Sequence, residues 1–157
     1  SKASLLNTVT VFSPADPVND QPRNTMRYDV QVSGGQTLSV YNVHMKSGNG
    51  GALDDPAVGT DRYRRVLEAQ RIRADAAALP ANRHFMVAGD FNIQSSQEDA
   101  FQELNGTTFN SGLFKDPINT PGTWNNNSAF RFIHTQDPKL QMDDRLDMLL
   151  LSSSLVD

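Results

Sequence analysis

The sequence predicts a single α/β domain whose sheet combines antiparallel hairpin pairing with helical crossover connections. Three observations lead to this prediction. The length of 157 residues suits one core. Two alternating segments joined by a Gly-Gly turn form a hairpin. Two helical segments are interleaved with apolar strands further along the chain.

The first part of the chain is predicted to form a strand, a loop and a hairpin. Residues 5–12 are rich in β-branched side chains, and three prolines in residues 13–24 mark the loop. Residues 25–32 alternate, residues 33–36 supply the turn, and residues 37–45 resume the alternation. One face of this hairpin, which includes Met26, Tyr28, Val30 and Val32, is expected to be buried.

Breaker residues separate the hairpin from a helix. Residues 46–59 hold four glycines and a proline, which predicts a long loop. Residues 61–79 have helical periodicity, with Thr60 or Asp61 as the cap and Pro80 as the stop. The chain therefore crosses from the hairpin to the next strand through a helix.

The second part of the chain is predicted less completely. Residues 84–88 form a short apolar strand, and Ser96 caps a helix that runs to Leu104, with Asp99 as its capping-box partner. Residues 105–144 are polar and rich in turns, and only residues 129–134 suggest a strand. Residues 145–151 are apolar again and form a final strand.

Composition excludes several classes of function. The net charge is −4 and the pI is about 5.2, so any contact with a nucleic acid must be local. The absence of cysteine excludes disulfides, thiolate metal sites and cysteine nucleophiles. No apolar run reaches the roughly 20 residues of a membrane span. The chain begins with Ser1 and stops after an apolar stretch, so we expect it to be part of a longer polypeptide.

The strand at residues 84–88 runs directly into Gly89, Asp90, Phe91 and Asn92. The carboxyl end of a buried strand is where an open α/β sheet presents its ligand-binding groups. There, Asp90 can hold a metal ion or a water molecule, and Asn92 can donate to a phosphoryl oxygen. The alternative is a simple turn, which these residue types also favour.

Three further polar residues lie at or near the ends of apolar strands. Asn42 and His44 end the second hairpin strand, and imidazole is suited to proton transfer near neutral pH. A histidine at the edge of the core is the structural alternative. Asp147 lies in an otherwise apolar strand, where a carboxylate needs a partner. It either orients an imidazole or forms a salt bridge with Arg145.

Two other features receive a structural interpretation. Five arginines lie in the first helix, and their spread around it favours a solvated face over phosphate binding. They are Arg62, Arg64, Arg65, Arg71 and Arg73. Trp124 follows a Pro-Gly turn and is interpreted as a core anchor rather than a base-stacking platform.

Taken together, four segments resemble the endonuclease/exonuclease/phosphatase superfamily, in its deoxyribonuclease-I-like form. They are residues 41–47 (YNVHMKS), 68–70 (EAQ), 87–92 (VAGDFN) and 145–152 (RLDMLLLS). The resemblance implies a four-layer α/β sandwich of two mixed sheets flanked by helices. It also implies hydrolysis of phosphate esters with a divalent cation, Mg²⁺ or else Mn²⁺ or Ca²⁺.

The resemblance assigns roles residue by residue. His44 matches the histidine that protonates the leaving oxygen, and Asp147 matches the carboxylate that orients a second histidine. Asp90 and Asn92 match the pair that binds the scissile phosphate, with Asp90 as a metal ligand. Asn42, Lys46 and Asn92 are the expected substrate-binding residues.

The resemblance covers only the middle and later part of such a domain. The upstream strands with an Asn and a metal-binding Glu, and the downstream Asp-His strand, are not in this chain. We therefore expect the parent chain or a second chain to supply the rest. The predicted function is that of a metal-dependent phosphodiesterase, a nuclease of the secreted bacterial type acting on nucleic acid or another phosphodiester. The alternatives are a sphingomyelinase-like or inositol-phosphate hydrolase and a non-catalytic remnant that serves as a binding module.

Overall fold

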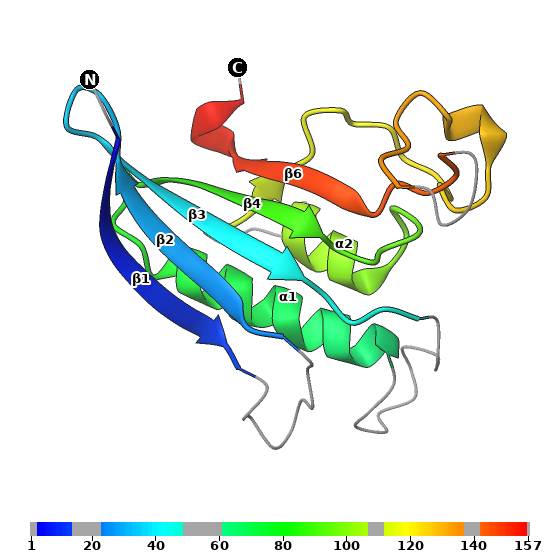
Figure 1. Ribbon diagram of the computed structural model, residues 1–157, viewed down its shortest axis with the longest axis horizontal. Helices are drawn as coiled ribbons and strands as arrows, with labels where there is room; N and C mark the ends of the chain where they lie inside the picture. The colour runs from blue at the N-terminus through cyan, green and yellow to red at the C-terminus, as the bar shows by residue number, and fades with distance from the viewer. Residues whose placement is uncertain (1–2, 14–22, 49–60, 107–111, 137–141, 157) are drawn as a thin grey trace.

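The computed structural model describes residues 3–13, 23–48, 61–106, 112–136 and 142–156 (Figure 1). The predicted loops at residues 13–24 and 46–59 lie mostly outside these described residues. The strands are β1 (Ser4–Phe12), β2 (Thr25–Gln31), β3 (Thr37–His44), β4 (His84–Asp90), β5 (Phe114–Lys115) and β6 (Asp147–Ser152). The α-helices are α1 (Asp61–Ala77) and α2 (Asp99–Asn105), and the short 3-10 helices are Ser128–Phe130 and Ser153–Leu155.

The strands form one six-stranded mixed sheet in the order β1-β2-β3-β4-β6-β5. Only β3 and β4 are parallel; the other neighbours in this sheet pair in the antiparallel direction. A parallel pair needs a long crossover connection, which α1 supplies between β3 and β4. This arrangement confirms the predicted α/β class, the hairpin and the crossover helix.

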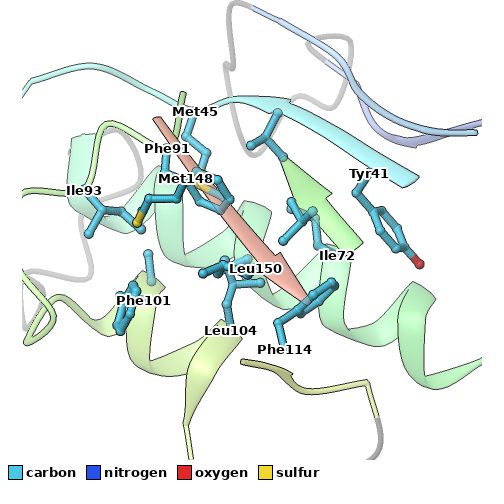
Figure 2. Packing of buried hydrophobic residues seen from close by; sticks show 14 of the residues in the cluster. Tyr41, Met45, Ile72, Phe91, Ile93, Phe101, Leu104, Phe114, Met148 and Leu150 are labelled. Atoms are coloured by element: carbon cyan, nitrogen blue, oxygen red, sulfur yellow. The ribbon is translucent and has the colours of Figure 1, made fainter. Parts of the chain in front are cut away.

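Both α-helices lie on the same side of the sheet (Figure 1), and the core lies between them and the sheet. Tyr41, Val87 and Leu150 come from three neighbouring strands in register, and none of them is exposed to solvent. Figure 2 shows Ile72 of α1 and Leu104 of α2 in the same layer. Trp124 is also fully buried in this core, which confirms its predicted anchoring role.

The opposite face of the sheet is apolar but is not covered by any described element. Met26, Tyr28 and Val30 are only partly buried, and Leu149 on the same face is 41% exposed. The expectation that this face of the hairpin is buried is therefore wrong for the described residues. The helices pack on the other face, where Ser39 donates a 2.6 Å hydrogen bond to the buried Asp29. The second sheet that the resemblance implies is not seen among the described residues.

Two predicted elements differ locally from the structure. Glu98 occupies the N-cap position of α2 without a capping hydrogen bond from its side chain, and the Ser96 hydroxyl instead accepts a 2.9 Å hydrogen bond from the backbone N–H of Gly122. Residues 128–130 form a 3-10 helix capped by the Asn127 side chain, not a strand. The short strand β5 was not predicted. Among the described helices, none is long and apolar enough to cross a membrane.

Candidate active site

Three of the predicted site residues form a row across the sheet. His44 is the last residue of β3, Asp90 is the last residue of β4, and Asp147 is the first residue of β6. The pairing register places Asp90 beside His44 on one side and beside Asp147 on the other. Figure 1 shows the corresponding ends of these strands at one edge of the sheet. The structure therefore brings together residues that are up to about a hundred positions apart in the chain.

A glycine permits the close approach of β4 to β3 at this edge. Gly89 has a φ of 138°, in the region that L side chains rarely adopt. A Cβ atom at this position would lie 2.0 Å from the carbonyl oxygen of Val43. The Gly-Asp dipeptide thus places the Asp90 carboxylate next to the end of β3, where a larger residue at position 89 would separate the strands.

Asn92 lies directly beyond the row and joins its segments. Its backbone N–H donates a 2.9 Å hydrogen bond to Oδ1 of Asp90, and its φ of 51° turns the chain there. Its Nδ2 donates to the carbonyl oxygen of Met45 at 3.0 Å, and the Met45 N–H donates to the carbonyl oxygen of Asp90 at 2.9 Å. The turn alternative and the site interpretation are therefore compatible, because the turn itself positions Asp90.

The electrostatics of the row centre on two neighbouring carboxylates. Nε2 of His44 lies 3.6 Å from Oδ2 of Asp90, with the His44 side chain 44% exposed and that of Asp90 15% exposed. Burial raises the pKa of Asp147, the negative charge of Asp90 raises it further, and His44 opposes both effects. The site therefore holds more negative charge than one imidazole compensates, so it favours a cation or a proton.

The two additional substrate-binding candidates differ in their surroundings. Asn42 is exposed on the same face of β3 as His44, two residues before it. The ammonium group of Lys46 lies 3.0 Å from Oδ1 of Asp61 at the start of α1, and it also donates to the carbonyl oxygen of Ser47. Asn42 is therefore open to a ligand, whereas Lys46 is engaged with the protein in this state.

Two carboxylates among the described residues could contribute to a cation site. Asp90 and Asp147 provide carboxylate oxygens side by side, and such hard oxygen ligands suit Mg²⁺, Mn²⁺ or Ca²⁺. No group of three or more His, Cys, Asp or Glu side chains among the described residues is arranged to hold a metal ion. Asp90 and Asp147 could therefore supply two oxygen ligands to a hard divalent cation, and any further ligands would have to come from water, from substrate or from outside the described part of the chain.

The other two histidines of the sequence lie away from this row. His84 is at the start of β4, at the opposite end of that strand from Asp90, with its Nδ1 2.9 Å from the hydroxyl of Ser154. Both ring nitrogens of His134 face backbone carbonyl oxygens, those of Met142 and Trp124. His44 is therefore the one histidine of this sequence that belongs to the row.

The structure contradicts one of the two alternatives for Asp147, the salt bridge with Arg145. Arg145, the proposed salt-bridge partner, forms a bidentate pair with Asp116 instead, with both distances 2.7 Å. Its guanidinium group also lies 4.9 Å from the centre of the Trp124 ring. The backbone of Asp147 is held by Thr135, whose hydroxyl accepts from its N–H and donates to its carbonyl oxygen. Among the described residues, Arg145 therefore does not pair with the Asp147 carboxylate.

Sequence reasoning missed one group beside the site. Arg65 was assigned to a solvated face, but it is fully buried and pairs with Glu98 at 2.8 Å. Thus the solvated-face interpretation is wrong for this arginine. The signal was present in the helix, since Arg65 shares the spacing of the buried stripe that continues through Ala69, Ile72 and Ala76.

Solved structures of low sequence identity share this fold. An endonuclease/exonuclease/phosphatase from Bacteroides vulgatus matches with a TM-score of 0.59 at 16% identity, covering 99% of this chain and 56% of its own. TDP2 from D. rerio, solved with a single-strand DNA product, matches with a TM-score of 0.59 at 16% identity over 96% of this chain and 54% of its own. SmcL matches with a TM-score of 0.57 at 17% identity over 98% of this chain and 51% of its own.

These matches establish the fold class. The chain has the fold of the endonuclease/exonuclease/phosphatase superfamily, as its four sequence segments predict, and it spans about half the length of the solved structures it matches. No family model matches the sequence, and no curated protein matches it.

Proposed function

We propose that this chain is the part of a phosphodiester hydrolase that carries its general acid and part of its cation site. The observation that carries the proposal is the row of His44, Asp90 and Asp147 at the open edge of the sheet. A proton donor and two carboxylates side by side match the needs of hydrolysing a phosphodiester. That reaction requires protonation of a leaving oxygen and neutralisation of charge on the phosphoryl group.

His44 is the proposed general acid. Its imidazole is partly exposed at the end of β3, so a substrate oxygen can reach it. Asp90, with its Oδ2 3.6 Å from Nε2, is placed to hold the orientation of the imidazole toward the leaving oxygen. In this role the imidazolium gives up one proton as the bond from phosphorus to the leaving oxygen breaks.

Asp90 and Asp147 are the proposed oxygen ligands on this chain for a divalent cation, with Mg²⁺ favoured over Mn²⁺ or Ca²⁺. When bound, such a cation neutralises phosphoryl charge and lowers the pKa of a water molecule. Asn92, held by its bond to the carbonyl oxygen of Met45, has its second Nδ2 hydrogen to donate to a phosphoryl oxygen. Asn42, on the same face, is the proposed contact to the neighbouring part of the substrate.

We further propose that the substrate is a nucleic acid, and that additional polypeptide completes the domain. The uncovered apolar face of the sheet supports the second part, because a sheet of this kind normally packs another layer against such a face. That layer would be a second sheet, giving the four-layer sandwich, and would come from the parent chain or from a second chain. The missing metal ligand and general base would come with it.

The test uses the full-length protein with supercoiled plasmid DNA. We expect nicking that needs Mg²⁺ or Mn²⁺, stops with EDTA and returns when the cation is restored. Asp90→Asn is expected to lower the rate at least about a hundredfold. Asp99→Asn, at the exposed start of α2, is the matched control and should cleave normally.

Parallel assays separate the alternatives. Cleavage of sphingomyelin or an inositol phosphate in place of DNA would support the proposed hydrolase activity. It would contradict the proposal that the substrate is a nucleic acid. Full cleavage in EDTA would contradict the cation dependence. A folded full-length protein with no activity on any of these phosphoesters would indicate a binding module that keeps the fold without the chemistry.

A further inference from the structure

A buried arginine lies beneath the two segments that carry the candidate catalytic residues. Arg65 is in the second turn of α1, and no part of its side chain is exposed. Its Nη1 donates to the carbonyl oxygens of Lys46 and Gly48, at 2.7 and 2.8 Å. These carbonyls belong to the segment that directly follows His44. One guanidinium group therefore holds the backbone that leaves the end of β3.

The other side of the same guanidinium group reaches the segment that follows Asp90. Nε and Nη2 of Arg65 both donate to Oε2 of Glu98, at 3.2 and 2.8 Å. The second carboxylate oxygen of Glu98 accepts a 2.8 Å hydrogen bond from the backbone N–H of Gln94, two residues after Asn92. The chain of contacts thus runs from the His44 segment through Arg65 and Glu98 to the Asn92 segment.

We infer that Arg65 is a positioning residue, which fixes the distance between His44 and the Asp90–Asn92 turn through its buried pair with Glu98. This inference rests on the proposed function for its kinetic consequence, but its structural content is independent of any activity. A single hydrogen-bonded arginine with donors on two sides can join two segments in a way that a lysine cannot. Catalytic geometry is sensitive to such support, since a misplacement of about 1 Å costs about a hundredfold in rate.

The chain offers a matched control in a second arginine–glutamate pair, which joins α1 to α2. Arg73 pairs with Glu103 of α2 at 2.9 Å. It lies eight residues after Arg65, about 12 Å further along the helix and away from the site. Arg65 joins α1 to Glu98, the residue directly before α2, and Arg73 joins α1 to α2 itself. Only Arg65 also holds the segment that follows β3. Comparing variants of Arg65 and Arg73 therefore separates an effect on the position of the site residues from an effect on the packing of the helices.

The experiment compares Arg65→Gln with Arg73→Gln in the full-length protein. Each variant is assayed at a temperature at which its own unfolding curve shows it to be folded. We expect Arg65→Gln to lower kcat about 10–100-fold with KM changed less than about threefold, because the groups are misplaced rather than lost. Arg73→Gln should retain kcat. If both variants lose activity only in proportion to their melting temperatures, the inference fails.

Amide hydrogen exchange measures the same coupling without any substrate. In Arg65→Gln, the Gln94 and Met45 amides should exchange at least about tenfold faster, while the amide of Val87 in the sheet centre is unchanged. Arg73→Gln should leave all three unchanged. Unchanged exchange in Arg65→Gln would overturn the inference even if the wild-type protein is a hydrolase. Faster exchange in a protein without activity would retain the inference and reject the proposed function.

A conservative variant covers the case in which Arg65→Gln fails to fold. Removing one partner of a buried ion pair costs about 3–5 kcal/mol, which a domain of this size does not always tolerate. Arg65→Lys retains the charge opposite Glu98 but lacks the fork that reaches both segments. We expect it to fold and to show intermediate exchange at Gln94 together with an intermediate kcat. If Arg65→Lys shows wild-type amide exchange at Gln94 and a wild-type kcat, the inference is overturned.

Discussion

Asp90 and Asp147 lie opposite each other in an antiparallel strand pair, at the edge of the sheet where both strands meet solvent. Like charges directly opposite each other across two strands are destabilising. Burial and the charge of Asp90 raise the pKa of the Asp147 carboxyl, with His44 as a partial counterweight. The arrangement therefore costs stability, and protonation of the Asp147 carboxyl relieves this cost.

Asp147→Asn is accordingly expected to stabilise the protein when no cation is present. A carboxyl with a raised pKa in the folded state binds more protons there than in the unfolded chain, so stability falls as pH rises through that range. In EDTA at pH 7, the variant should melt about 2–4 °C higher than wild type. This gain in melting temperature should disappear in acid, below the ordinary pKa of the carboxyl. Thermal unfolding curves of both proteins across this pH range measure the difference. A destabilised variant at pH 7 would mean that the ionised carboxylate has a favourable partner.

Gly89→Ala is expected to be among the most disruptive small substitutions in the chain. The new Cβ would meet the Val43 carbonyl oxygen at 2.0 Å, and the φ of 138° is itself unfavourable. Backbone strain alone costs about 1–3 kcal/mol, and separating β3 from β4 adds to it. Gly34→Ala is the control, because Gly34 also has a positive φ but has no atom within 4 Å of its Cβ position. Urea unfolding should show a clearly larger loss for Gly89→Ala; equal losses would mean that the strands move apart at little cost.

The sequence alone predicts the row of site residues for a specific physical reason. His44, Asp90 and Asp147 each lie at the end of an apolar run, and strand ends are short-range features of the sequence. Once the order of the strands is known, their ends meet at one edge. The α1 prediction succeeds equally because helical periodicity and capping are local: residues 61–79 were expected, and Asp61–Ala77 is observed.

What could not be predicted depends on contacts between distant segments. The alternation in β2 and β3 does not determine which face of the hairpin is buried. The face on which α1 and α2 pack determines it. Arg65 looks solvated as one of several arginines, and only its distant partner Glu98 makes its burial tolerable. In the same way Arg145 selects Asp116, which lies 29 residues away, over its near neighbour Asp147.

Glu68 provides a second prediction about pH, away from the site. Burial raises the pKa of its carboxyl from an ordinary 4.5 to about 7, although a hydrogen bond from the Thr25 hydroxyl opposes this effect. Stability should therefore be greatest below pH 4.5 with respect to this group and fall as pH rises through 7. Glu68→Gln should remove up to about 3 kcal/mol of this change in the free energy of unfolding with pH. The variant should therefore be more stable than wild type at pH 8. Glu103→Gln, at a more exposed glutamate of α2, is the control and should keep the fall in stability as pH rises through 7. A profile of wild-type shape in Glu68→Gln would contradict the assignment.

The last prediction separates the roles of His44 and Asp147 in the full-length protein. If His44 protonates the leaving oxygen, His44→Ala should lower turnover of a natural phosphodiester by about 10²–10⁴-fold. A nitrophenyl ester has an acidic leaving group that needs little protonation, so His44→Ala should turn over that substrate at close to the wild-type rate. Asp147→Ala should damage both substrates alike, because orienting a base or binding a cation is needed whatever the leaving group. Rates on the two substrates, measured at saturating Mg²⁺, give the comparison. Equal losses for His44→Ala on both would point to phosphate binding by His44 in place of proton transfer.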